Sequence, residues 1–206
     1  MKKLTLAMLL ALIGATAMAQ NFEGSTIEER IAHSTGQDED SIKTAKGYIT
    51  MFQQTGTNKD WQDMYENYKW LKEYAPFAVN GIYTQGPFMF YNLINAEQDQ
   101  TKKKQYFDEM MELFSLRQKN LDALNSFAKT KSTLGDVLSV KAEYYNWTAP
   151  SVLGQNFDLR ESYKNFSEAI KMVNGRRLSL TAFSVIMILD KTAEELGIKD
   201  YSVFRG

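Results

Sequence analysis

The chain has 206 residues, with 24 basic and 25 acidic side chains, one histidine and no cysteine. The net charge is therefore close to zero, which excludes the strong positive electrostatic potential that favours binding to nucleic acid or to a membrane surface. The lack of cysteine excludes disulfides, so burial of side chains has to stabilise the fold. Aromatic residues make up 13% of the chain, which argues against long disordered stretches.

The first nineteen residues have the pattern of a secretory signal peptide. Two lysines precede an apolar run over residues 4–15, and small residues lead up to Gln20. The apolar run is too short to span a bilayer with ease. We expect cleavage between Ala19 and Gln20, no membrane insertion of the mature chain, and a location in the periplasm, at the outer membrane or outside the cell. About 187 residues then remain, enough for one ordinary domain.

Helical periodicity dominates the rest of the chain. Residues 20–37 lack a hydrophobic period and carry several small residues, which predicts a flexible lead-in before a helical domain over residues 38–206. The expected breaks are a stop at Gly56, a kink or late start at Gly86-Pro87, and a loop from Ala149 onward. No stretch has the period of a strand, so the predicted fold class is all-α. The predicted helices cover about residues 42–55, 59–74, 80–96, 101–124, 134–147, 159–174 and 178–196.

Two charged runs lie at predicted helix starts. The acidic run over residues 38–40 favours capping of a helix N-terminus, and it lacks the rest of a calcium-loop pattern. Three lysines at 102–104 open another helix, where positive charge is unfavourable to the helix dipole.

An aromatic and aliphatic spacing recurs three times. It is similar to the tetratricopeptide opening W-x2-L-G-x2-Y, although the separations between copies are longer than the usual repeat. The copies are Trp61-x2-Met64-Tyr65-x2-Tyr68, Phe107-x2-Met110-Met111-x2-Phe114 and Tyr163-x2-Phe166-Ser167-x2-Ile170.

The segment WQDMYENYKWLKEYAP, followed by an apolar helix and a long Lys-rich helix ending near Arg117, resembles exported tetratricopeptide-like proteins of Bacteroidetes. The resemblance implies antiparallel helix pairs stacked as an α-α superhelix, with a protein-binding use and no catalytic residues. It also implies that Asp40-Ser41-Ile42 fits an O-glycosylation pattern at Ser41. The alternative for Asp40 or Ser41 is a helix cap.

The residue types needed for most catalytic sites are missing. The only histidine, His33, lies in the unpatterned lead-in, so packed Ser-His-Asp and Cys-His sites have no base and a zinc site is disfavoured. Neither a phosphate-binding loop nor a dinucleotide fingerprint occurs. We therefore expect no enzyme activity, no cofactor and no metal.

Aromatic side chains off the main apolar stripes are the candidate partner-binding residues. Exposed Trp and Tyr are good anchors for a protein partner or for the face of a sugar. The alternative is core burial, which we favour for both Trp70 and Trp147. The candidates are Trp70, Tyr74, Tyr144 and Trp147.

The segment 178–189 carries nine apolar residues in twelve, too many for a one-sided helix. This pattern predicts a partner surface that includes Ile186, facing either a second copy or the continuation of a longer parent chain. An internal helix is the alternative.

The sequence thus favours an exported scaffold that binds a protein or peptide partner. A carbohydrate-binding accessory protein with exposed Trp and Tyr is the first alternative, and a helical enzyme is the second.

Overall fold

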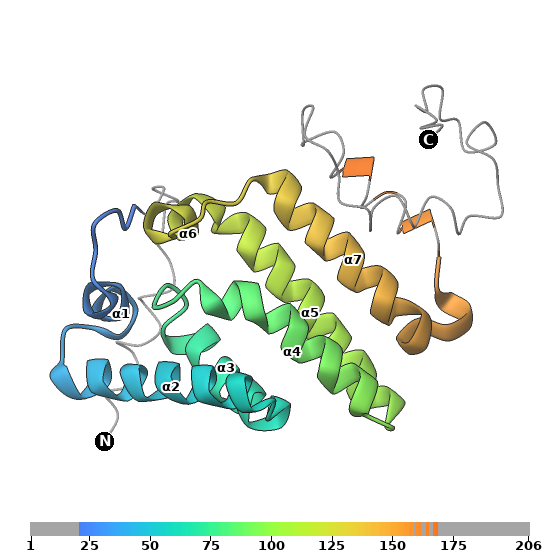
Figure 1. Cartoon of the computed structure of the whole chain (residues 1–206), viewed down its shortest axis with the longest axis horizontal. Coiled ribbons are helices and arrows are strands. Elements are labelled where there is room, and N and C mark those ends of the chain that lie inside the picture. The colour runs from blue at the N-terminus through green and yellow to red at the C-terminus, as the bar shows by residue number, and fades with distance from the viewer. Residues whose placement is uncertain (1–20, 159, 162–163, 165–166, 169–206) are drawn as a thin grey trace, which may run out of the picture. The chain divides into compact units, whose positions relative to one another are not determined.

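The computed structural model describes residues 21–158, 160–161, 164 and 167–168 (Figure 1). In this part of the chain every regular element is helical, which confirms the all-α prediction at the level of fold class. In chain order the elements are α1 (Ile27–Thr35), α2 (Glu39–Asn58), α3 (Trp61–Tyr74), α4 (Gly81–Ala96), α5 (Gln100–Lys119), α6 (Leu121–Phe127), α7 (Leu134–Leu153) and the 3-10 helix η1 (Gly154–Asn156).

The chain divides into two compact units. The described part of the first contains residues 21–84 and 119–131, and that of the second contains residues 85–118, 132–158, 160–161, 164 and 167–168. The first unit holds α1, α2, α3 and α6, and the second holds α5, α7 and most of α4.

Residues 21–37 pack into the first unit, although the sequence predicted no helix before residue 38. Thr26 and Glu29 form a reciprocal capping box at the start of α1, and Ile31 is fully buried. The Arg30 guanidinium donates to the carbonyl oxygens of Ser25 (2.7 Å), Phe77 (3.1 Å) and Ala78 (3.2 Å). It thereby ties α1 to the loop after α3.

The joint between α2 and α3 is two residues long. Asp38 caps α2, and Asp60 caps α3. The predicted stop at Gly56 is wrong, because α2 continues to Asn58 and the left-handed turn falls on Lys59 (φ 60°). The N–H of Lys59 then donates to the Gly56 carbonyl and closes the helix.

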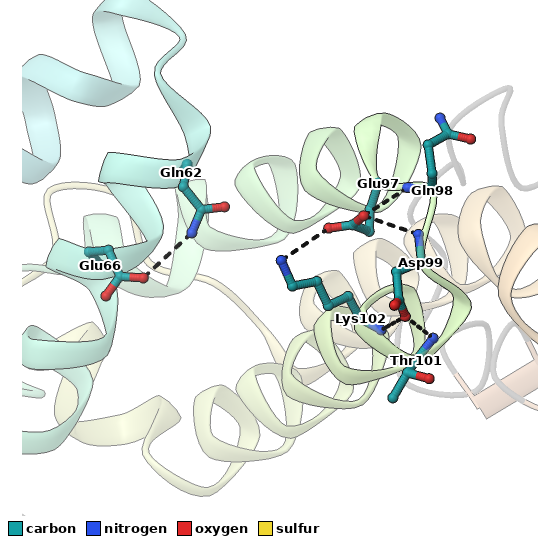
Figure 2. Close-up of polar contacts among 7 residues, drawn as sticks. All are labelled: Gln62, Glu66, Glu97, Gln98, Asp99, Thr101 and Lys102. Carbon is teal, nitrogen blue, oxygen red and sulfur yellow. Dashed lines mark hydrogen bonds and ion pairs between the residues drawn. The ribbon is translucent and has the colours of Figure 1, made fainter.

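The turn into α5 explains how three lysines are tolerated at a helix start (Figure 2). The Asp99 carboxylate accepts the backbone N–H groups of Thr101 (2.7 Å) and Lys102 (3.0 Å). Glu97 accepts the N–H groups of Gln98 and Asp99, and its carboxylate lies 3.7 Å from the Lys102 ammonium. These carboxylates supply the negative charge that the helix N-terminus requires.

The helix predicted over 80–96 agrees with α4, which contains Pro87, so of the two alternatives for Gly86-Pro87 the late start is wrong. Two other predicted boundaries are also wrong. The helix predicted over 101–124 is interrupted at Asn120, which separates α5 from α6. The loop expected from Ala149 is absent, because α7 continues through Pro150 to Leu153. The helices predicted over 159–174 and 178–196 lie almost wholly or wholly outside the described residues, as do the leader and its cleavage site.

Candidate functional site

A pocket in the first unit is lined by the end of α1, the first turns of α2 and the last turns of α3. Its volume is about 390 Å³. Binding pockets for small molecules usually enclose about 300–1,000 Å³, so this one lies near the lower end of that range. We call it the α1–α3 pocket; its lining residues are Ser34, Thr35, Asp40, Ser41, Thr44, Trp70 and Tyr74.

Three aromatic rings form one wall of this region. Tyr48 of α2 stacks in parallel on Trp70 of α3, with ring centroids 4.2 Å apart and an interplanar angle of 4°. Tyr74 lies one turn further along α3, 5.1 Å from the Trp70 ring, and is 47% exposed. Tyr48 therefore fixes the orientation of Trp70, while Tyr74 remains open to a ligand.

The opposite side of the pocket is polar. Asp38 accepts the backbone N–H of Ser41 at 2.9 Å, and hydrogen bonds from the Ser41 hydroxyl and from this N–H lower the pKa of the Asp38 carboxyl. The acidic run therefore caps a helix, as the sequence indicated, with Asp38 as the capping residue. Within the described part of the chain the side chains of Asp40 and Thr44 make no hydrogen bond, so their oxygens are available to a ligand.

A second aromatic group lies on the second unit. Tyr91 of α4 lies 6.2 Å from Tyr144 and 5.8 Å from Trp147, both on α7. Phe88 stacks on Tyr91 at 6.5 Å. Phe88 is 48% exposed and Trp147 is 49% exposed. We call these four residues the Trp147 patch.

Tyr144 anchors this patch to the core of the second unit. Its ring contacts Phe114, a fully buried residue of α5, at 6.2 Å. Burial is the largest of the effects that raise the pKa of the Tyr144 hydroxyl. The exposed Trp147 ring, with its centroid 5.2 Å from that of Tyr144, thus packs against a residue that is itself held by the core.

The predicted partner residues therefore separate into two groups. The α1–α3 pocket contains Trp70, Tyr74 and Ser41, and the Trp147 patch contains Tyr144 and Trp147. The expected core burial of Trp147 is wrong, because the buried stripe of α7 runs through Val137, Leu138 and Ala142 on another face. Trp70 is half-buried under Tyr48. Ile186 lies outside the described residues.

Sequence reasoning missed Tyr48, Phe88 and Tyr91. The last two have a recognisable signal, because they are three residues apart on one helix, as Tyr144 and Trp147 are on another. Tyr48 has no such signal, since its partner Trp70 belongs to a different helix.

Among the described residues no three His, Cys, Asp or Glu side chains are grouped so as to hold a metal ion. No helix among the same residues has the length and apolar content needed to cross a membrane.

Comparison with known protein families, curated proteins and solved structures finds no match to this chain.

Proposed function

We propose that this chain is an exported, non-catalytic helical scaffold that binds a protein or peptide partner in the cell envelope. The observation that carries the proposal is the Trp147 patch. Aromatic residues that are half exposed and rigidly supported are the side chains that contribute most binding energy in protein interfaces. An exposed aromatic group of this kind is unusual on a surface that contacts only water.

The helical arrangement supports the scaffold part of the proposal. In the tetratricopeptide-like spacing, Met64 and Tyr68 of α3 are buried, and so are Phe107, Met110 and Phe114 of α5. Burial of these positions is what stacked helix pairs require. A tetratricopeptide-like superhelix of divergent repeats is therefore part of the proposal.

Site-specific crosslinking tests the partner surface. A photo-reactive phenylalanine analogue at Phe88 should crosslink to one recurring envelope protein or peptide in an exporting host. The same analogue at Met51, an equally exposed residue of α2 in the first unit, is the control and should not capture that partner.

A second variant tests whether crosslinking at Phe88 depends on the other residues of the Trp147 patch. Trp147→Ala should reduce the Phe88 adduct about tenfold or more, because truncating a central aromatic anchor commonly costs 2 kcal/mol or more of binding energy. Equal adducts at Phe88 and Met51, or an adduct unaffected by Trp147→Ala, would contradict the proposal.

The export part of the proposal has its own test. The mature protein from an exporting host should begin at Gln20, because the residues before it are the small ones that a signal peptidase accepts. Intact-mass measurement decides this, and a product that retains residues 1–19 would overturn the location.

A further inference from the structure

The α1–α3 pocket is lined by both aromatic and polar side chains. Trp70 and Tyr74 supply aromatic surface, and the facing residues supply hydroxyl groups and one carboxylate. The Trp147 patch, in contrast, is wholly aromatic and lies on the other unit. The two surfaces therefore suit ligands of different chemistry.

A pyranose ring has the same combination of surfaces. The C–H groups on one face carry partial positive charge and pack against the negative face of an aromatic ring, while the hydroxyl groups at the rim need donors and acceptors. The pocket presents aromatic rings for the first kind of contact. Asp40 and Thr44 can form the second.

We propose that the α1–α3 pocket binds one neutral pyranose unit of a carbohydrate, with the sugar packed against Tyr74 and Trp70 and hydrogen-bonded to Asp40. This inference goes beyond the proposed peptide-binding function and does not depend on it. Among the described residues the Asp40 carboxylate is the one charged side chain that lines the pocket, so neutral sugars are accepted and uronic acids are repelled.

The stack of Tyr48 on Trp70 holds the Trp70 ring in place before a ligand binds. A ring already held by a parallel neighbour at 4.2 Å loses little freedom when a ligand arrives. Weak sugar contacts can therefore contribute to binding, since little of their energy is consumed in ordering the protein.

The chain contains three tryptophans, so each indole N–H gives its own signal in a proton–nitrogen correlation spectrum. The experiment uses residues 20–206 made in a bacterial cytosol that attaches no O-linked glycan. It is titrated with cellohexaose, maltohexaose, N-acetylchitohexaose and, as the acidic comparison, hexagalacturonate. At least one neutral oligosaccharide should shift the Trp70 signal at millimolar concentration and leave the Trp147 signal unmoved.

Three variants test the contacts. Tyr74→Ala changes an exposed side chain and should raise the dissociation constant about tenfold, as expected for the loss of one stacking contact. Asp40→Asn removes the negative charge and should bring the dissociation constant for the acidic oligosaccharide closer to that for the neutral ones. Trp147→Ala is the matched control and should leave sugar binding unchanged.

Two results would overturn the inference. One is that no neutral oligosaccharide shifts the Trp70 signal. The other is a shift that persists at the same concentration in Tyr74→Ala. Neither result bears on the crosslinking test at Phe88, so failure of this inference and failure of the proposed function are distinguishable.

Discussion

Arg30 is the side chain that most clearly organises the first unit. It is 7% exposed, and its guanidinium lies 4.2 Å from the centre of the Phe127 ring while donating to the nearby carbonyl of Ser25 and to the distant carbonyls of Phe77 and Ala78. Burial lowers the pKa of Arg30, and the nearby Glu28 and Glu29 oppose that shift. A planar group with donors in a fixed fork fits this position, and a lysine ammonium does not.

Replacing Arg30 should therefore destabilise the protein. Arg30→Ala leaves the Phe77 and Ala78 carbonyls without this donor, and we expect a loss of about 2–4 kcal/mol in the free energy of unfolding. Arg30→Lys should recover only part of it. Urea unfolding followed by circular dichroism measures both, with the highly exposed Arg160→Ala as a control that should change stability by less than about 0.5 kcal/mol. Equal stabilities of Arg30→Ala and the control would show that the contacts of Arg30 are not stabilising.

Ser41 has a second predicted role, because the resemblance implies an O-linked glycan there. In a host that carries out such glycosylation, intact mass should show a sugar increment on the wild type that Ser41→Ala lacks. A glycan that survives this substitution would exclude Ser41 as the attachment site. The backbone N–H of residue 41 still donates to Asp38 in the variant, so the helix cap is retained.

At the scale of single elements, the sequence predicted helix centres well and helix ends poorly. The positions of α2, α3 and α5 follow from their apolar stripes, which are buried as expected. Helix ends depend on local hydrogen bonds that a hydrophobic pattern does not reveal. The Gly56 error arose because the left-handed residue is Lys59, and the missed helix α1 has few apolar residues and depends on Arg30.

For the α1–α3 pocket and the Trp147 patch, the sequence identified individual residues but not which residues lie together. Trp70, Tyr74, Tyr144 and Trp147 were identified because they lie off the apolar stripes. That Trp70 lines the same pocket as Asp40 and Thr44 could not be predicted, because these residues come from different helices and only the packing of α2 on α3 brings them together.

The turn before α5 should be sensitive to acid. Backbone N–H groups of residues 98 to 102 are the largest causes that lower the pKa of Glu97 and of Asp99. A carboxyl whose pKa is lower in the folded state stabilises the fold above its ordinary pKa near 4, and this contribution is lost as the pH falls through the folded value. The stabilisation is therefore complete at pH 6 and disappears at strongly acidic pH.

The variant Asp99→Ala tests the expected direction of this pH dependence. The variant should melt at a lower temperature than the wild type at pH 6, and the difference should shrink steadily as the pH is lowered from 5 to 2. Thermal melting followed by circular dichroism is sufficient, because the wild type is its own reference at each pH. A difference that stays constant across this range would show that the Asp99 carboxylate does not cap α5 through its charge.

At the scale of the whole molecule, the chain has no cysteine and must reach a stable state without a disulfide. The two units meet this need with large buried side chains, among them Phe52, Tyr68, Phe90 and Phe114. The apolar segment 178–189 lies outside the described residues. Its composition still predicts a surface that another polypeptide covers.

Light scattering of residues 20–206 tests whether that polypeptide is a second copy of the chain. We expect the wild type to form a dimer or larger assembly and Ile186→Glu to form a folded monomer, because a charge on a buried contact surface opposes association. If the wild type is monomeric and Ile186→Glu unfolds, the segment belongs to an internal core and the prediction is wrong.

The contact between Phe22 and Ser126 constrains the order in which the chain can fold during its synthesis. The Phe22 N–H donates to the Ser126 hydroxyl at 2.8 Å, across 104 residues. The Phe22 ring also packs against His33 and Phe77, with ring centroids 5.2 Å and 5.1 Å apart, but the Phe22 N–H lacks its Ser126 acceptor until α6 has been synthesised. The segment before α1 therefore completes its contacts only after more than half of the chain has been made.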